Sequence, residues 1–266
     1  PGAGGWWAGS GAGAGAGLTV ANTPPVRDVA PTVQRLRMRY AKRGRLRFSS
    51  HRDFQRAFER ALRRASIPMA YSAGFSPHPK VSYANAAPTG VASEAEYVEF
   101  GVVAACDPAA VRAALDSALP PGLDVVEVVE ARTPDFVQRL EASVWRIELP
   151  GVTVAEATVA LDRLLAEPEV IVERLMKNGP RRFDARGAVL RADVVGDAAG
   201  DEVCAILTVV VRHATPSVRP DDVLSALRRV ADLVPPKPPR VTRLAQGPLD
   251  EAGTAVADPF APDRAG

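Results

Sequence analysis

The sequence has few of the residues that covalent cross-links, metal clusters and membrane spans require. Cys106 and Cys204 are its only cysteines, and they lie in unrelated contexts without CxxC spacing. This argues against a disulfide framework, a zinc knuckle and a cysteine-ligated iron–sulfur cluster, and we expect no cofactor. Few cysteines fit a reducing, cytoplasmic location. No run of about 18 apolar residues occurs, so no contact with a membrane is predicted.

The two ends of the chain lack the apolar periodicity of a folded core. Residues 1–32 are rich in Gly and Ala and have no basic residue before their apolar part, so we expect a disordered extension rather than a signal peptide. Residues 247–266, rich in Pro, Gly and Asp, are predicted to form a disordered tail. The length favours two domains between them, at 33–133 and 142–246.

Basic charge is concentrated in one part of the chain. Between Arg35 and Arg64 there are twelve Lys and Arg against two acids, a local net charge of +10. Because the formal net charge of the whole chain is +2, the rest carries −8. A basic cluster of this density attracts polyanions even when the overall charge is near balance.

Two periodic segments follow each other within this basic region. Residues 35–40, RLRMRY, alternate apolar and basic side chains, which predicts a half-buried strand with an arginine-lined outer face. Residues 51–65 have apolar residues at helical spacing, with Ser50 as the expected N-cap and Asp53 at the third position. The arginines of this helix lie on the face opposite its apolar stripe.

The pattern of elements repeats along the chain. From residue 34 to 132 the order is strand, helix, strand, strand, helix, strand, and a similar order recurs from 143 to 246. In this second part, residues 177–187 (KNGPRRFDARG) are expected to form another basic loop, broken by Gly and Pro, that contains the aromatic residue Phe183. The fold class predicted is α+β, with two tandem ferredoxin-like (βαββαβ) halves and antiparallel sheets.

Several short motifs in the first half resemble those of a bacterial family. They are RFSSHRD at 47–53, RALRRA at 60–65, GFSPHPK at 74–80, and Gly90 with SEAEY at 93–97. The resemblance is to the radical SAM-linked, or radical SAM-associated, proteins, a domain of unknown function found fused to or beside cobalamin-binding radical SAM proteins. It extends over residues 34–245 and implies an accessory to radical SAM chemistry with a radical SAM protein as partner. The sequence lacks the CxxxCxxC motif that would hold the cluster itself.

The arginines are the first candidate site. Guanidinium groups bind phosphate through paired hydrogen bonds, so a dense group of them favours RNA or another polyanion. An acidic protein partner and a simply solvated face are the alternatives. The residues expected to contact phosphate are Arg37, Arg39, Arg47, Arg56, Arg60 and Arg63.

The GFSPHPK loop is the second candidate site. Gly74 permits unusual backbone angles, and Pro77 and Pro79 hold their neighbours extended, so the loop is stiff before anything binds. It is either a connector with Phe75 in the core or a loop that contacts a ligand. The residues expected at the ligand are His51, Phe75, His78, Lys80 and Tyr83.

These observations predict a non-catalytic RNA-binding accessory of a radical SAM enzyme, in RNA modification or a translation-linked process. No nucleophile motif, nucleotide-binding glycine fingerprint or standard metal-ligand spacing occurs, so no catalytic or metal residue is assigned. One alternative is a metal-independent endoribonuclease in which His51 and His78 act as base and acid. The other is a protein-interaction adaptor for the radical SAM partner that does not bind RNA.

Overall fold

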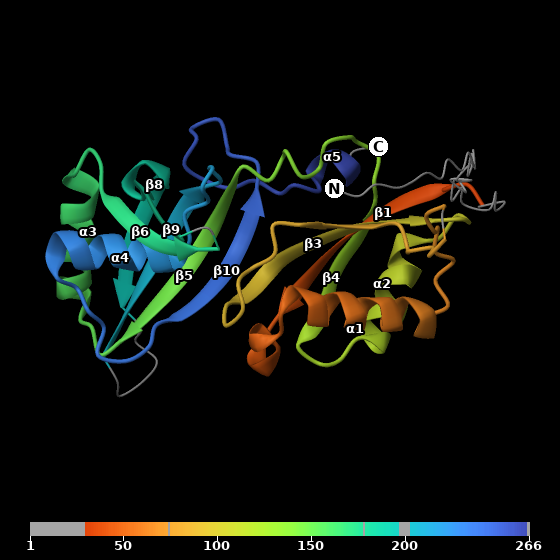
Figure 1. Ribbon diagram of the computed structural model, residues 1–266, viewed down its shortest axis with the longest axis horizontal. Coiled ribbons are helices and arrows are strands. Elements are labelled where there is room, and N and C mark those ends of the chain that lie inside the picture. The colour runs from red at the N-terminus through yellow and green to blue at the C-terminus, as the bar shows by residue number, and fades with distance from the viewer. Residues whose placement is uncertain (1–29, 74, 178, 197–202, 265–266) are drawn as a thin grey trace, which may run out of the picture.

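The computed structural model describes residues 30–73, 75–177, 179–196 and 203–264, so the Gly/Ala-rich extension, except for its last three residues, lies outside the described residues. The protein is a mixed α+β structure built on one eight-stranded, mostly antiparallel sheet (Figure 1). A separate two-stranded hairpin stands apart from this sheet. None of the helices in the described ranges is long and apolar enough to cross a membrane.

The first half has six main elements. They are β1 (Gln34–Lys42), α1 (His51–Arg64), β2 (Val81–Ala84), β3 (Ala92–Val102), α2 (Pro108–Ala118) and β4 (Leu123–Glu130), with a short 3₁₀ helix, η1 (Gly44–Phe48), before α1. The strand order is β4-β1-β3, with β2 paired to β3, and all these pairs are antiparallel. The strands and helices predicted for this half are therefore present.

The second half repeats this arrangement and adds a hairpin. Its elements are β5 (Ala142–Pro150), α3 (Val154–Ala166), β6 (Ile171–Met176), β7 (Gly179–Asp184), a 3₁₀ turn η2 (Arg186–Ala188), β8 (Val189–Gly196), β9 (Cys204–Arg212), α4 (Pro220–Ala231) and β10 (Arg240–Gly247). The sheet order is β10-β5-β9-β8. In both halves the last main strand lies beside the first.

The two halves share one sheet because β3 is longer than its partner β2. Strand β2 pairs with Tyr97–Phe100, and β10 runs parallel to the start of β3, at Ala92 and Ser93. Both strands therefore lie along the same edge of β3, β10 beside its first residues and β2 beside its later ones. The four helices α1 to α4 pack in two pairs on one side of this sheet, each pair over its own hydrophobic core.

The opposite face of the sheet is covered by two irregular segments. Residues 131–141 and the C-terminal segment 248–264, which ends in α5 (Ala261–Arg264), enclose a small core with Tyr97, Phe136 and Phe260. Phe260 is fully buried and packs edge-on against Tyr97. The prediction of a disordered tail is therefore wrong for residues 248–264: one aromatic side chain and one carboxylate anchor a segment that has no periodic pattern.

Candidate nucleic-acid interface

Helix α1 positions the basic face and forms as its sequence predicts. Ser50 and Asp53 make a capping box, in which the Ser50 hydroxyl accepts from the Asp53 backbone N–H and the Asp53 carboxylate accepts from the Ser50 N–H. The Ser50 hydroxyl also donates to the Asp53 carboxylate at 2.7 Å, and this hydrogen bond, together with that from the Ser50 N–H, lowers the pKa of Asp53. Phe54 and Phe58 are buried within the apolar stripe, which orients the opposite face of the helix toward solvent.

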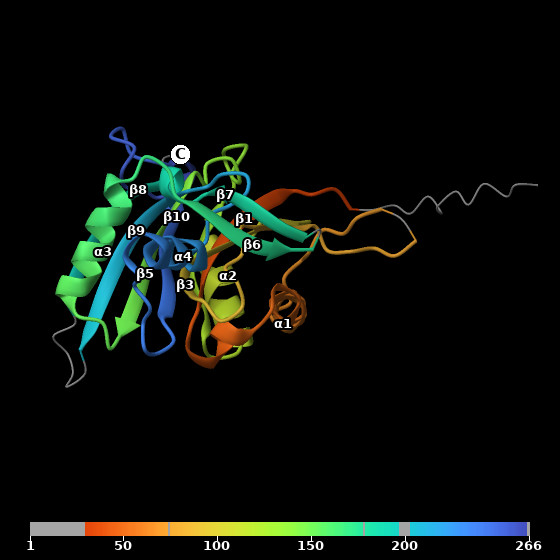
Figure 2. The same ribbon diagram turned by 60° about the vertical axis from the view of Figure 1, so that its left-hand side comes forward.

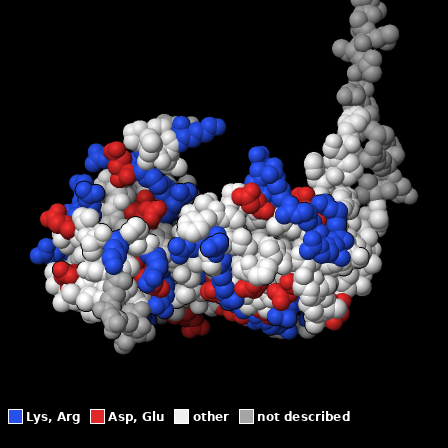
Figure 3. Space-filling view, turned by 90° about the horizontal axis from the view of Figure 1, so that it is seen from below, with Lys and Arg blue, Asp and Glu red and all other residues white. Residues whose placement is uncertain are grey.

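That solvent face carries four arginines in a single row, at Arg52, Arg56, Arg60 and Arg63, and all four are exposed. At a rise of about 1.5 Å per residue the row is roughly 16 Å long. None of the four makes an ion pair among the described residues, although Arg52 and Arg56 interact electrostatically with Asp53. Figure 3 views the molecule from this side and shows Lys and Arg in clusters over both halves. The row is therefore free to bind an external anion.

The stiff loop predicted at 74–80 projects beside this helix. Tyr71 pairs with Pro79 across the base of the loop, and the Ser72 backbone N–H donates to the His78 carbonyl at 2.8 Å. Phe75 is 53 % exposed and Tyr71 is 41 % exposed. Of the two alternatives for Phe75, burial in the core is thus excluded. Gly74 lies outside the described residues.

A small cavity of about 200 Å³ joins the loop to the arginine row. Its lining combines the loop residues Tyr71, Pro77, His78 and Pro79 with Glu59, Leu62, Arg63, Ile67 and Met69 from α1 and the turn after it. Lys80, which follows the loop, is exposed and its ammonium donates to the Thr32 hydroxyl at 3.2 Å. The predicted loop and the predicted helix face are therefore neighbours.

The two histidines of this region are not brought together. His51 lies in the first turn of α1, where its ring stands edge-on to Tyr83 at 4.9 Å and its Nε2 contacts Gln55. His78 lies in the cavity near Glu59 and Arg63, about 12–18 Å further along the helix at its normal rise. Tyr83 is half-buried, and burial raises the pKa of its hydroxyl. A shared acid–base site at these two histidines has no geometric support.

The sheet arginines lie elsewhere. Arg35, Arg37 and Arg39 point to the side of the sheet opposite the helices, so they cannot form one face with the arginines of α1. Arg37 is 3 % exposed, and it donates to Glu99 at 2.8 Å and to Asp263 at 2.6 Å. The assignment of Arg37 as a phosphate contact is therefore wrong.

The remaining predicted arginines are partly engaged. Arg39 is half-buried on the same side as Arg37, and one of its nitrogens lies 3.7 Å from Glu127. Arg47 belongs to η1, where its guanidinium lies 4.7 Å above the Phe48 ring. Because η1 leads directly into α1, Arg47 lies at the same end of the basic face as Arg52. Arg47, Arg56, Arg60 and Arg63 thus remain candidates, and Arg39 lies apart from them.

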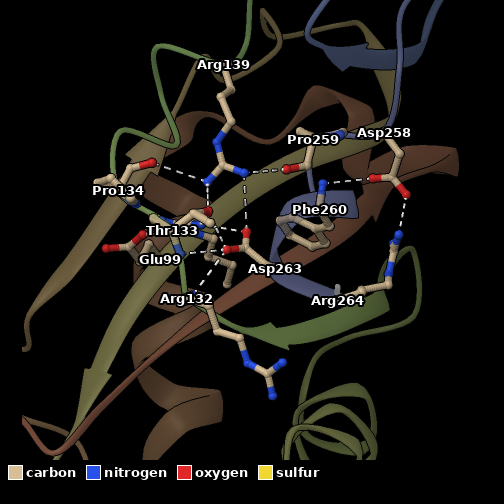
Figure 4. Close-up of polar contacts among 11 residues, drawn as sticks. Glu99, Arg132, Thr133, Pro134, Arg139, Asp258, Pro259, Phe260, Asp263 and Arg264 are labelled. Atoms are coloured by element: carbon tan, nitrogen blue, oxygen red, sulfur yellow. Dashed lines mark hydrogen bonds and ion pairs between the residues drawn. The ribbon is translucent and has the colours of Figure 1, made fainter. Parts of the chain in front are cut away.

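Several donors converge on the buried carboxylate of Asp263 (Figure 4). Asp263 accepts from Arg37, from the Thr133 hydroxyl at 2.6 Å and from the Thr133 backbone N–H at 3.0 Å. Arg139 lies 3.5 Å away. Burial by itself raises the pKa of Asp263, but the hydrogen bonds from Thr133 and Arg37 outweigh it and lower that pKa below its usual value. This cluster holds the C-terminal segment against the sheet and is structural.

The segment expected as a basic loop in the second half is instead the β6–β7 hairpin. Phe183 is buried there, with the Arg174 guanidinium 4.9 Å above its ring. The exposed tip of the hairpin carries Leu175 and Lys177, followed by Arg181 and Arg182 on β7. The hairpin and the 71–79 loop project toward the same side of the molecule (Figure 2).

Sequence reasoning missed the seam between the two helix pairs. There Arg243 of β10 is buried, forms an ion pair with Glu96, and donates to the Asn85 carbonyl at 2.7 Å. Lys42 is buried nearby and donates to the carbonyls of Ala87 and Pro88 at 3.3 Å each. These residues are far apart in the chain, and each lies in a strand with other charged residues, so no local signal in the sequence set them apart.

Fold and surface together define an α+β protein with a basic helix face and no metal cluster among the described residues. The chain belongs to the bacterial family described as "Uncharacterized protein conserved in bacteria (DUF2344)", whose model matches residues 35–220. No protein of curated function matches it. Among solved structures, one that is similar over 84 % of this chain and 93 % of its own is the cryo-EM structure of the encapsulated DyP-type peroxidase from Mycobacterium smegmatis, with 10 % identity and a TM-score of 0.19. A similarity at that level carries no argument about fold or function.

Proposed function

We propose that the protein is a non-catalytic RNA-binding accessory that acts with a radical SAM enzyme. The observation that carries the RNA-binding part is the row of four exposed arginines on α1 beside a preordered loop with exposed aromatic rings. Guanidinium groups bind phosphates, and aromatic rings stack on unpaired bases. The two together suit single-stranded RNA better than a purely acidic protein surface, which offers nothing for Phe75 to stack on.

The partnership with a radical SAM enzyme rests on the motifs at 47–53 and 74–80. The first motif includes the end of η1 and the start of α1, and the second forms the exposed loop beside that helix. Co-purification of the protein with a cobalamin-binding radical SAM protein of the same bacterium tests this part. Association with that enzyme without any affinity for RNA would instead support the adaptor alternative.

We also propose that each half is a ferredoxin-like unit, with the β6–β7 hairpin as an insertion in the second. The support is the strand order, β4-β1-β3-β2 in one half and β10-β5-β9-β8 in the other, with two helices on one side. An experimental structure in which either strand order differed would overturn this assignment.

Removal of the exposed ring in the loop is expected to weaken RNA binding without changing its salt dependence. Stacking on one base contributes about 1–3 kcal/mol, so Phe75→Ala should raise the Kd for single-stranded RNA by about five- to 150-fold. The slope of log K against log salt should stay the same, because no charge is removed. Phe75→Tyr, which keeps the ring, serves as the matched control. Equal affinity of the Ala and Tyr variants would show that Phe75 does not contact RNA.

Substitution of the histidines tests the endoribonuclease alternative. Because His51 and His78 lie too far apart to form one acid–base site, His51→Ala and His78→Ala should each still bind RNA. Neither the original protein nor the variants should cut a labelled RNA incubated without metal ions. Metal-independent cleavage by the original protein that both variants lose would replace the accessory hypothesis with the nuclease.

A further inference from the structure

A cavity of about 470 Å³ opens in the seam between the two helix pairs. The first half contributes the loop after β2, with Asn85, Ala86, Pro88 and Thr89. The second half contributes Ser143 and Trp145 of β5, the segment from His213 to Arg219 and Arg243 of β10. Its volume lies within the range of about 300–1,000 Å³ usual for small-molecule sites, and such sites favour junctions of this kind.

The charge of the lining is one-sided. It includes Arg219 and Arg243 and no carboxylate. The other three cavities described in the structure each have at least one acidic side chain: Glu99 and Asp135, Glu59, or Glu156 and Asp232. An anion therefore meets no like charge in the seam cavity, in contrast to the other three.

The floor of the cavity is held rigidly and carries a positive charge. Arg243 uses its guanidinium within the protein, toward Glu96, the Asn85 carbonyl and the Ser93 hydroxyl. Lys42 lies behind the Asn85–Thr89 loop with two carbonyls as its partners. Lys42 and Arg243 share one carboxylate, Glu96, and burial lowers the pKa of Lys42.

Arg219 is the second cation of the cavity lining, after Arg243. It is exposed at the start of α4 and makes no ion pair among the described residues. The Asp222 carboxylate, which interacts electrostatically with Arg219, already accepts from Arg174 at 2.6 Å and from the Arg219 backbone N–H at 2.7 Å. The Arg219 guanidinium is thus left for a ligand.

The remaining wall is neutral and partly apolar. His213 Nδ1 donates to the Leu140 carbonyl at 2.6 Å, so its Nε2 accepts from the Ser143 hydroxyl at 2.7 Å. Burial lowers the pKa of His213, and the charge of Arg243 lowers it further, so the ring is uncharged at neutral pH. The Asn85 amide and the Thr89 hydroxyl add hydrogen-bonding groups, beside the apolar surfaces of Pro88, Ala214 and Val218.

We infer that the seam cavity binds a nucleoside monophosphate, either free or as the phosphorylated end of an RNA. Arg219 binds the phosphate, and the Asn85–Thr89 loop and the Ala214–Val218 segment enclose the nucleoside. The cavity is formed by residues outside the α1 arginine row, so the inference does not rest on the proposed function.

Calorimetric titration of the full chain with adenosine 5′-monophosphate tests the site. Binding to adenosine and to inorganic phosphate should each be at least about tenfold weaker, since each supplies half of the contacts. Arg219→Gln should weaken the monophosphate by about tenfold or more. Arg228→Gln, at the far end of the same helix, is the matched control and should leave the affinity unchanged. Ala86→Trp fills the cavity from an exposed position and should prevent binding without affecting the fold.

A second pair of ligands distinguishes a free nucleotide from the phosphorylated end of an RNA. A short RNA with a 5′-phosphate and the same RNA with a 5′-hydroxyl are compared on the Arg56/Arg60/Arg63→Ala variant, which keeps only Arg52 of the α1 row. A preference for the phosphorylated end that Arg219→Gln removes identifies an RNA terminus as ligand. Binding of the free monophosphate with no such preference identifies a free nucleotide. No binding of the monophosphate by the original protein overturns the inference, as does binding by the Arg219→Gln and Ala86→Trp variants that is as tight as that of the original protein. Either result leaves RNA binding on α1 untouched.

Discussion

Replacing Arg56, Arg60 and Arg63 with alanine is expected to remove most of the affinity for single-stranded RNA. Each guanidinium that neutralises a phosphate releases counterions, and the slope of log K against log salt falls by about 0.7 per contact on a single strand. The triple variant should therefore reduce the slope by about 2, with the loss of affinity largest at low salt. The fold should be unaffected, since all three side chains are exposed and alanine favours helix.

The control removes the same charge from the other half. Arg163 of α3 and Arg228 and Arg229 of α4 are exposed, so Arg163/Arg228/Arg229→Ala lowers the net charge equally. If affinity depends on the α1 row, this variant should lose much less of it across the salt series. Equal losses in the two triple variants would mean that RNA responds to total charge and not to this surface. Absence of binding by the original protein at low salt would contradict the RNA-binding proposal altogether.

Loss of the Asp263 carboxylate is expected to have the largest effect on stability. Asp263→Ala leaves Arg37 buried, with Glu99 as its remaining carboxylate partner, and frees the segment that covers Phe260. Breaking a buried ion pair from one side costs about 3–5 kcal/mol. For a chain of this size the midpoint of thermal unfolding should fall by about 10 °C. Circular dichroism during heating measures it.

Two further variants separate the ion pair from a general disturbance of the tail. Glu251→Gln, an exposed acid in the same segment, should leave the unfolding midpoint unchanged. Arg37→Met combined with Asp263→Leu removes both charges and should recover part of the loss, because a buried guanidinium that has lost one of its two carboxylates is worse than an apolar pair. If the double variant were less stable than Asp263→Ala, the buried charge of Arg37 would not be the cause.

The contribution of Asp263 to the free energy of unfolding should also depend on pH. The pKa of Asp263 is lower in the folded protein than in the unfolded chain, so its stabilising effect is complete above the ordinary Asp range near 3.9. That effect is lost as the pH falls through the lower, folded pKa. The free energy of unfolding of Asp263→Ala should therefore decrease less on acidification than that of the original protein. Parallel decreases in urea titrations at several pH values would contradict this.

Local patterns in the sequence were sufficient for the helix at the centre of the proposed interface. Ser50 and Asp53 identified the start of α1, and the spacing of Phe54, Ala57 and Phe58 identified its buried side. The exposure of Arg56, Arg60 and Arg63 follows from that spacing alone. Alternation in residues 35–40 likewise identified β1, with Leu36 and Met38 in the core.

The same alternation could not show what covers the outer face of β1. Arg37 has the spacing of an exposed residue, but a segment more than 220 positions later brings Asp263 to it. A local period reports which side of a strand a residue occupies, whereas the presence of another layer on that side depends on distant residues. The predicted tail failed for the same reason, since Phe260 alone carries no periodicity.

Sequence by itself determined most of the order of strands and helices, the apolar faces and the basic region, because these depend on neighbours within a few turns or strands. It missed β7, whose residues were expected to form a loop. Tertiary structure alone decided that β10 continues the edge of β3 beyond β2, that the sheet and helix arginines lie on opposite sides, and that Asn85, Arg219 and Arg243 surround one cavity. Those outcomes depend on pairing between residues far apart in the chain. Such pairing is selected by the packing of the whole sheet and leaves no period in the sequence.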